Sequence, residues 1–307
     1  MYWEAFEKFQ AIPEIKNLED NKKFCMVLKD MLDAHIIVIQ KFAMGIRETA
    51  CHMEPHQCDK FLNEMLRSRI GRRVISQQHL RYSDIWEGRY PEQKHVSGII
   101  NTQCSALETV QKCTDLAGRL FKDNYQLNPP HVEIEGHFGA KLTYISGHLQ
   151  YIIYELLKNS MQHTVKKHSK LPQNNKTQVP SMAEEAIAEA KKIKKTDIKN
   201  SKLPPIKVTI GQSDTEVMFR ISDQGGGIPN DLINNVWSYW YVSDRNQTNF
   251  EEKPHLENLN LGMGLCIARA YANYWGGTMH GYGTDAYVKI STENEKEVTE
   301  SKVRSNK

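Results

Sequence analysis

Glu155 and Asn159 lie four residues apart in the segment ELLKNSMQHT, and their side-chain types could do chemistry. The apolar residues around them recur at helical spacing, so both groups are expected on one face of a helix, one turn apart. A carboxylate and a carboxamide each cost free energy to bury without a partner. The pair therefore indicates that something binds at this helix face, and the rest of the chain has to identify it.

Two glycine-rich stretches could complete such a site. In ISDQGGGIP, residues 221–229, a strand delivers Asp223 and three glycines follow, which can take positive φ angles and approach a ligand closely. In LNLGMGLCIARAYA, residues 259–272, Gly262 and Gly264 open a helix, whose unpaired N–H groups suit phosphates. Each motif alone has an ordinary explanation, a loop or a partly exposed helix residue. Their order, with G-T-D before a last strand, favours a functional site.

The elements that position these motifs follow from the periodicity of apolar residues. Residues 21–121 contain little Gly or Pro and repeat apolar residues at helical spacing, which predicts about four antiparallel helices. Further helices are predicted at residues 144–164, 229–239 and 264–275, and strands at 132–134, 206–210, 217–221 and 286–290. We therefore predict an α+β protein, in which an N-terminal four-helix-bundle-like domain precedes an α/β sandwich with a mixed sheet.

The paired prolines of LNPPHV mark the boundary between two domains. We place the helical domain at residues 1–127, the α/β domain at 128–291 and a polar tail at 292–307. Residues 166–205 are polar and lysine-rich and offer little to pack, so we interpret them as a mobile insertion.

Composition excludes several classes of function. The net charge of +3 is too small to predict a nucleic-acid partner, and 39% hydrophobic residues can fill real cores. Six scattered cysteines without a C-x-x-C pair argue for reduced thiols and against a zinc site. The longest apolar run, residues 36–39, is far too short to span a membrane. The first residues also do not read as a signal or transit peptide.

The motif order resembles the ATP-binding domain shared by gyrase, Hsp90, histidine kinases and MutL, over residues 132–290. The resemblance implies that Asn159 ligates Mg²⁺, that Asp223 accepts from the adenine amino group, and that Thr284 lies near the adenine. It implies that Glu155 faces the γ-phosphate and takes a proton from the attacking hydroxyl. The other nucleotide-binding positions that it implies are Lys158, Gly225, Gly227, Ser243, Gly262, Met263, Gly264 and Leu265.

Further stretches extend the resemblance over most of the chain: FLNEMLRSRIGRRVISQQH, SGIINTQCSALETVQKCTDLA, ELLKNSMQHT, ISDQGGGI and ARAYANYWGG. Together they look like the mitochondrial protein kinases that phosphorylate 2-oxoacid dehydrogenase complexes. This resemblance implies a serine/threonine kinase that uses ATP and Mg²⁺, with K⁺ as a candidate further ion. It also implies that the chain inactivates the decarboxylase α subunit, forms a homodimer, docks on the lipoyl domain of the acyltransferase core and works in the mitochondrial matrix.

Within that family we favour the branched-chain complex as the substrate. Pyruvate dehydrogenase kinases typically carry a histidine four residues before the base, and this chain has Tyr151 there, as the branched-chain kinase does. The stretch RAYANYWGG and the absence of a C-terminal Asp-Trp motif favour the same choice. The alternatives are a pyruvate dehydrogenase kinase, an ATP-binding regulatory subunit with little kinase activity, and a histidine kinase that uses His79 as phosphoacceptor.

Two departures from the family pattern bear on the nucleotide site. Gln162 stands where family kinases usually have an arginine, which removes a cation near the nucleotide. The segment YWGGTMHGYGTD is several residues shorter than expected, which predicts a shortened strand or turn before Thr284.

Other polar and aromatic residues have two interpretations each. His79 is expected to make a structural contact, and His35 either packs or lines the pocket where family members bind regulatory oxoacids. Trp237, Trp240 and Tyr241 lead into a predicted lid at residues 244–261, and we interpret them as packing residues.

Overall fold

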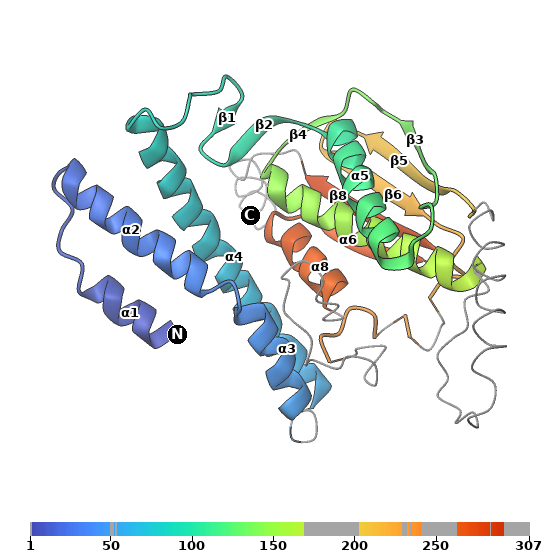
Figure 1. The fold of residues 1–307 in the computed structure, drawn as a ribbon, viewed down its shortest axis with the longest axis horizontal. Helices are drawn as coiled ribbons and strands as arrows, with labels where there is room; N and C mark the ends of the chain where they lie inside the picture. Colours follow the sequence, from blue (N-terminus) through green and yellow to red (C-terminus); the bar gives the residue numbers. More distant parts are fainter. Residues whose placement is uncertain are drawn as a thin grey trace, which may run out of the picture. The chain divides into compact units, whose positions relative to one another are not determined.

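The computed structural model describes residues 2–49, 52, 54–168, 203–228, 232–233, 235–240, 263–282 and 284–291. Its helices are α1 (Tyr2–Gln10), α2 (Leu18–Ala34), α3 (Val38–Thr49), α4 (Pro55–Trp86), α5 (Ala106–Tyr125), α6 (Ser146–His168) and α8 (Gly264–Tyr274) (Figure 1). Its strands are β1 (Val96–Ser97), β2 (Ile100–Ser105), β3 (Val132–Gly136), β4 (Lys141–Tyr144), β5 (Ile206–Gln212), β6 (Glu216–Ser222), β7 (Thr278–Tyr282) and β8 (Asp285–Ser291).

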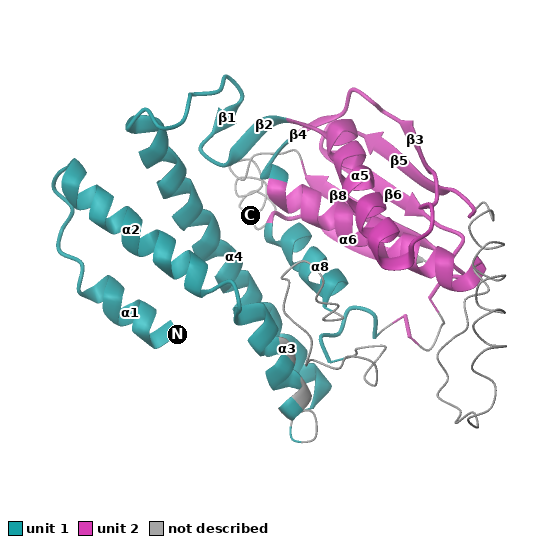
Figure 2. Ribbon diagram, in the orientation of Figure 1, with its two compact units in different colours: residues 1–103, 143–146, 234–274 teal, residues 104–142, 147–233, 275–307 magenta. Residues whose placement is uncertain are grey.

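The chain divides into two compact units, which Figure 2 colours separately. The first contains residues 1–103, 143–146 and 234–274, and the second contains residues 104–142, 147–233 and 275–307. A helical N-terminal region followed by an α/β domain with a mixed sheet confirms the predicted fold class. The domain bounds inferred from the prolines stay predictions.

The second unit is built on a five-stranded mixed sheet in the order β3-β5-β6-β8-β7. Strand β3 pairs with β5 in parallel, and the other neighbours are antiparallel. Alternate residues on one face are fully buried, as the aligned Ile210, Phe219 and Val288 illustrate. Burial of these side chains is the main free-energy term that holds the sheet to the helices.

Helices α5 and α6 lie side by side over this sheet (Figure 1), and the Cys113 thiol of α5 donates to the carbonyl oxygen of Gln150 in α6 at 3.3 Å. Ser105 is the N-cap of helix α5, and its hydroxyl accepts from the amide of Glu108 at 3.2 Å. Helix α6 is apolar around much of its circumference, and Ile152, Ile153 and Leu157 are fully buried. It is therefore a rigid support for the polar residues that it carries.

The first unit is organised around the 32-residue helix α4. Helices α2 and α8 pack against α4, and a Cβ atom added at Gly71 of α4 would lie 3.2 Å from the Tyr274 hydroxyl of α8. The segment before α8 is also held to α4, because the Tyr239 amide donates to Asp59 Oδ1 at 2.8 Å and its hydroxyl donates to Asn63 Oδ1 at 2.9 Å. Strands β1, β2 and β4 form a separate three-stranded sheet.

Several elements differ from the sequence-based expectation, and helix α1 and strands β1, β2 and β4 were not predicted. Helix α6 continues to His168, where lysines and a histidine in its last turn favour the helix terminus electrostatically. The described residues of the predicted helix at 229–239 form turns instead, because the backbone there bonds to Asp59 and to Asn235. Strand β7 was not predicted. No helix in the described part of the chain has the length and apolar character that a membrane span requires.

Candidate functional site

Helix α6 places Glu155 and Asn159 one turn apart, about 6 Å along its axis. Glu155 is only 6% exposed and Asn159 is half-buried. The Lys158 ammonium lies 2.5 Å from Glu155 Oε2, but outside hydrogen-bonding geometry, so this buried oxygen has no hydrogen-bond partner among the described residues. A buried carboxylate with unused acceptor capacity is suited to receive a proton from a bound hydroxyl.

Lys158 is held on two sides. Its ammonium lies 5.6 Å from the centre of the Tyr154 ring, and its side chain is 19% exposed. A cation in that position compensates the buried Glu155 charge. Tyr151, four residues before Glu155, is half-buried on the same helix.

The second predicted motif forms a tight loop after β6. Asp223 Oδ1 accepts from the amide of Gly225 at 2.8 Å, and the side chain is half-buried. Gly226 and Gly227 have φ angles of 98° and 76°, which side-chain-bearing residues rarely adopt. Glycine is therefore required at both positions.

The loop lies directly against α6. A Cβ atom added at Gly225 would lie 2.7 Å from His163 Cβ and 2.9 Å from the His163 carbonyl carbon. His163 is one turn beyond Asn159, so the fold brings the Asp223 loop and the polar face of α6 together. The nucleotide prediction requires the Asp223 loop to lie against the helix that carries Glu155 and Asn159, and the Gly225–His163 contact is consistent with it.

Thr284 also lies beside Asp223, since the Asp223 amide donates to the Thr284 carbonyl oxygen at 3.2 Å. The short segment before Thr284 does not interrupt the sheet. Strand β7 pairs with β8 over its full length, from Thr278 opposite Lys289 to Tyr282 opposite Asp285. The two motifs expected at the adenine therefore lie next to each other.

The other predicted nucleotide residues divide into two groups. Met263 is buried, and Gly264 and Leu265 begin α8 in the first unit. Ser243, Gly262 and the predicted lid at residues 244–261 lie outside the described residues, as do Tyr241 and most of the predicted insertion.

Three residues of the last turns of α6 were missed by the sequence analysis. The first is His163, described above. The second is Lys167, whose side chain covers Gly226, because a Cβ atom added there would lie 3.3 Å from the Lys167 ammonium nitrogen. The third is His168, whose Nε2 atom lies 2.9 Å from the Gln224 carbonyl oxygen. Asn159, His163 and Lys167 recur every four residues, and this spacing could have placed them on one helix face. Lys167 brings a cation to this loop, whereas Gln162 is neutral and half-buried.

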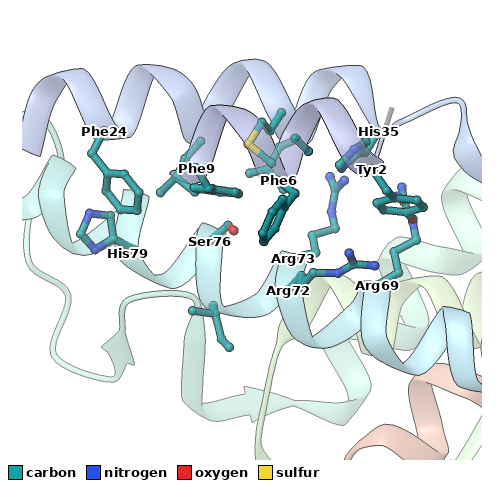
Figure 3. A pocket seen from close by; sticks show the side chains of 15 residues that line it. Tyr2, Phe6, Phe9, Phe24, His35, Arg69, Arg72, Arg73, Ser76 and His79 are labelled. Carbon is teal, nitrogen blue, oxygen red and sulfur yellow. The ribbon is translucent and has the colours of Figure 1, made fainter. Parts of the chain in front are cut away.

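A separate cavity of about 480 Å³ lies between α1, α2 and α4 of the first unit. Figure 3 shows Arg69, Tyr2 and His35 toward one end and Phe24 and His79 toward the other. Arg72 and Arg73 add two further cations, and the buried Tyr2 hydroxyl has no hydrogen-bond partner among the described residues. His35 therefore lines a pocket that combines an apolar wall with a cationic end.

His79 makes contacts typical of a packed histidine. Its Nε2 atom lies 2.9 Å from Asn21 Oδ1, and its ring packs edge-on against Phe24 with centroids 5.1 Å apart. Trp237 and Trp240 are half-buried, and the Arg269 guanidinium lies 5.0 Å from the Trp237 ring centre. These contacts support the packing interpretation of all three residues.

Comparisons with known proteins match the two halves separately. Residues 1–101 match the family described as mitochondrial branched-chain alpha-ketoacid dehydrogenase kinase. Residues 145–300, half of the chain, match the family described as histidine kinase-, DNA gyrase B-, and HSP90-like ATPase.

Similar proteins over nearly the whole chain are mitochondrial pyruvate dehydrogenase (acetyl-transferring) kinases. The one from Arabidopsis thaliana is 27% identical over 94% of this chain and 74% of its own length. Kinase 2 from Saccharomyces cerevisiae is 25% identical over 94% of this chain and 68% of its own length. Human isozyme 1 is 29% identical over 90% of this chain and 60% of its own length.

The residues that match the ATPase family include α6, the Asp223 loop and strands β5, β6, β7 and β8. The helical half matches a kinase of the same group, and the full-length relatives are protein kinases. The chain therefore belongs to the histidine kinase-, DNA gyrase B- and HSP90-like ATPases, and among them it is an ATP-dependent protein kinase of the 2-oxoacid dehydrogenase kinase group.

Proposed function

We propose that this kinase transfers the γ-phosphoryl group of ATP to a serine on the decarboxylase α subunit of a mitochondrial 2-oxoacid dehydrogenase complex and so inactivates the complex. The observation that carries the proposal is the contact between α6 and the Asp223 loop, where Gly225 lies against His163. This contact supports the proposal, because it brings the loop that carries the proposed adenine acceptor, Asp223, against the helix that carries Glu155.

Each residue of the proposed site has a distinct role in the transfer. Asp223 Oδ2 accepts from the adenine amino group, while the Gly225–Gly227 backbone allows the nucleotide to approach closely. Glu155 Oε2 takes the proton of the serine hydroxyl as oxygen attacks the γ-phosphorus. Lys158 balances the negative charge of that carboxylate until the proton arrives.

The residues present fit a magnesium ion. Mg²⁺ prefers oxygen ligands and is usually held by one or two protein groups together with substrate phosphates. On the resemblance to the family, the Asn159 carboxamide is the proposed protein ligand, and phosphates of the nucleotide would complete the set. When bound there, the ion would neutralise charge on the transferring phosphoryl group.

The branched-chain complex is the first candidate substrate. The match of residues 1–101 and the presence of Tyr151 support it. The pyruvate complex is a second candidate of equal weight, because the relatives that extend over most of the chain are pyruvate dehydrogenase kinases. Because the chain resembles this family, we also propose that it forms a homodimer, docks on a lipoyl domain and acts in the mitochondrial matrix.

We also propose that the cavity in the first unit takes a small regulatory 2-oxoacid. Arg69, Arg72 and Arg73 suit its carboxylate, and the aromatic wall suits its apolar side chain. Calorimetric titration with a branched-chain 2-oxoacid and with pyruvate tests this proposal. The Arg73→Gln protein should lose affinity for the preferred acid, and equal binding by both proteins would contradict the proposal.

A transfer assay tests the proposed reaction. The chain is incubated with Mg·ATP and, separately, with branched-chain and pyruvate dehydrogenase complexes freed of their own kinase. We expect acid-stable phosphate on one decarboxylase α subunit, and we expect Glu155→Gln to lower the rate by about 10²–10⁴-fold, the usual contribution of a general base. ATP binding should survive the substitution, because Glu155 is not expected to contact the base or ribose.

The outcomes separate the alternatives. Labelling of only the pyruvate complex assigns the second substrate. ATP binding without label on either complex favours a regulatory subunit with little kinase activity. Acid-labile phosphate on the chain itself, abolished by His79→Gln, would support a histidine kinase. The packed, hydrogen-bonded His79 argues against that last outcome.

A further inference from the structure

A cluster of four polar side chains lies on the face of the sheet opposite the buried apolar residues. Asp285 Oδ2 accepts from Arg220 Nη2 at 2.8 Å, from Arg220 Nε at 3.1 Å and from the Tyr287 hydroxyl at 3.2 Å. The Ser222 hydroxyl donates to the same carboxylate. Two of these residues belong to β6 and two to β8, so one carboxylate ties the ends of two strands together.

The location of this cluster is its most informative property. Ser222 and Asp285 are paired at the end of the β6–β8 ladder. The next residue of one strand is Asp223, and the residue before the other is Thr284. A backbone bond of 3.2 Å, from the Asp223 amide to the Thr284 carbonyl oxygen, joins the two segments just beyond the ladder. Both residues expected at the adenine thus lie immediately beyond the cluster.

Burial does not explain the cluster, since the Arg220 side chain is 45% exposed and the Asp285 side chain is 17% exposed. Exposed ion pairs add little to stability in general. A carboxylate with donors from three side chains is, however, strongly fixed in direction, because each donor restricts its movement. We therefore expect this cluster to fix the positions of the two strand ends rather than to add much stability.

We infer that Arg220 and Asp285 are positioning residues for nucleotide binding, which hold Asp223 and Thr284 at the separation that adenine recognition requires. The inference rests on the proposed nucleotide site. Neither side chain is expected to touch the nucleotide, because both act on Asp223 and Thr284 through the adjacent backbone.

The same two strands provide a matched control. Glu216 of β6 and Lys289 of β8 form a second cross-strand ion pair, with a single contact of 3.7 Å and side chains 46% and 48% exposed. Glu216 lies at the opposite end of the ladder, where it faces Ser291. A substitution at Glu216 tests whether a loss of ATP affinity in Asp285→Asn arises merely because the sheet is weakened.

The experiment uses the full chain with Mg·ATP and compares Asp285→Asn, Arg220→Met, Arg220→Lys and Glu216→Gln. For Asp285→Asn and Arg220→Met we expect KM and Kd for ATP to rise by about tenfold with kcat nearly unchanged, the pattern of lost ground-state binding. Arg220→Lys should restore most of the affinity, and Glu216→Gln should stay within about twofold of the parent. The preference for ATP over GTP should also fall in the first two variants, because Asp223 reads the amino group.

Further comparisons keep the inference falsifiable. Asp223→Asn tests the nucleotide site itself. If Asp223→Asn weakens ATP binding and Asp285→Asn does not, the positioning role is wrong and the site stands. If Glu216→Gln weakens ATP binding as much as Asp285→Asn, the pair acts only through sheet stability and the inference fails. If Asp223→Asn has no effect, the proposed site is wrong and the inference falls with it. Should Asp285→Asn fail to fold, Arg220→Met on the more exposed partner decides the question.

Discussion

At the scale of residues, the proposed site depends on close approach between the backbone of the Asp223 loop and helix α6. Gly225 lies so near His163 that no side chain can fit between them, and Gly226 and Gly227 adopt positive φ angles. The helix that carries Glu155 and Asn159 packs against this loop through His163 and Lys167. Small steric changes in the loop should therefore affect nucleotide binding directly.

We predict that Gly225→Ala weakens Mg·ATP binding by at least about tenfold and lowers the free energy of unfolding by about 1–3 kcal/mol, because the new Cβ must push the loop from α6. Fluorescent-nucleotide titration and urea denaturation measure the two effects. Gly147→Ala is the control, because nothing lies within 4 Å of its added Cβ and alanine favours a helix over glycine. An unchanged affinity in Gly225→Ala would contradict the tight contact.

The Asp285 carboxyl gives a pH prediction. Burial raises its pKa, but hydrogen bonds from Ser222 and Arg220, the Arg220 charge and the Tyr287 hydroxyl outweigh burial, so its pKa lies below its ordinary value of 3.8. The folded state thus favours the charged form, and this stabilisation is present above pH 3.8 and lost as pH falls through the depressed value.

Urea denaturation of the parent and of Asp285→Asn measures this contribution. The difference in free energy of unfolding between the two proteins should be constant near neutral pH and should shrink below the ordinary pKa of aspartate. A difference that grows on acidification would have the wrong sign and would contradict the depressed pKa.

At the scale of elements, α6 and the five-stranded sheet support the site as a unit. Leu157 is fully buried between the two functional turns of α6, and Phe219 is fully buried at the centre of the sheet. Cavities in this layer should disturb both stability and the position of the catalytic turn.

We predict that Leu157→Ala lowers the free energy of unfolding by about 2–5 kcal/mol, the usual range for a leucine removed from a core. Lys166→Ala, at an exposed position of the same helix, should change it by less than about 0.5 kcal/mol. Urea denaturation followed by circular dichroism measures both. Equal effects of the two substitutions would show that α6 does not pack as described.

At the scale of the whole molecule, ligand binding and folding are linked. Asp223 lies far from Asn159 and Glu155 in the sequence, so the proposed nucleotide site exists only in the folded chain, and we expect Mg·ATP to bind the folded state alone. Ligand at about 100 times its Kd should then stabilise the chain by about 2.7 kcal/mol.

Thermal denaturation tests this linkage. We expect a rise in Tm with Mg·ATP, a smaller rise when a chelator removes Mg²⁺, and little rise for Asp223→Asn. An equal rise with and without the chelator would contradict the proposed Asn159 metal site, and an equal rise for Asp223→Asn would contradict the adenine acceptor.

Much of the fold could be predicted from the sequence because its signals are local. Alternation of apolar residues located β5, β6 and β8, and helical spacing located α6 and α8 within a few residues. The predicted helix at 229–239 was wrong in its described part, because Tyr239 bonds to Asp59, 180 residues earlier. Strand β7 was missed because its residues, TMHGY, form a strand only through pairing with β8.

The sequence by itself determined the types of element, the mixed α+β class and the motifs that the chain shares with its family, since periodicity and glycine content are properties of short segments. The tertiary structure decided which motifs meet. It placed Gly225 against His163, grouped the arginines of α4 with His35 and Tyr2 around one cavity, and joined Arg220 to Asp285 beside Thr284. These contacts depend on strand register and helix packing, which arise between segments far apart in the chain, so no local pattern encodes them.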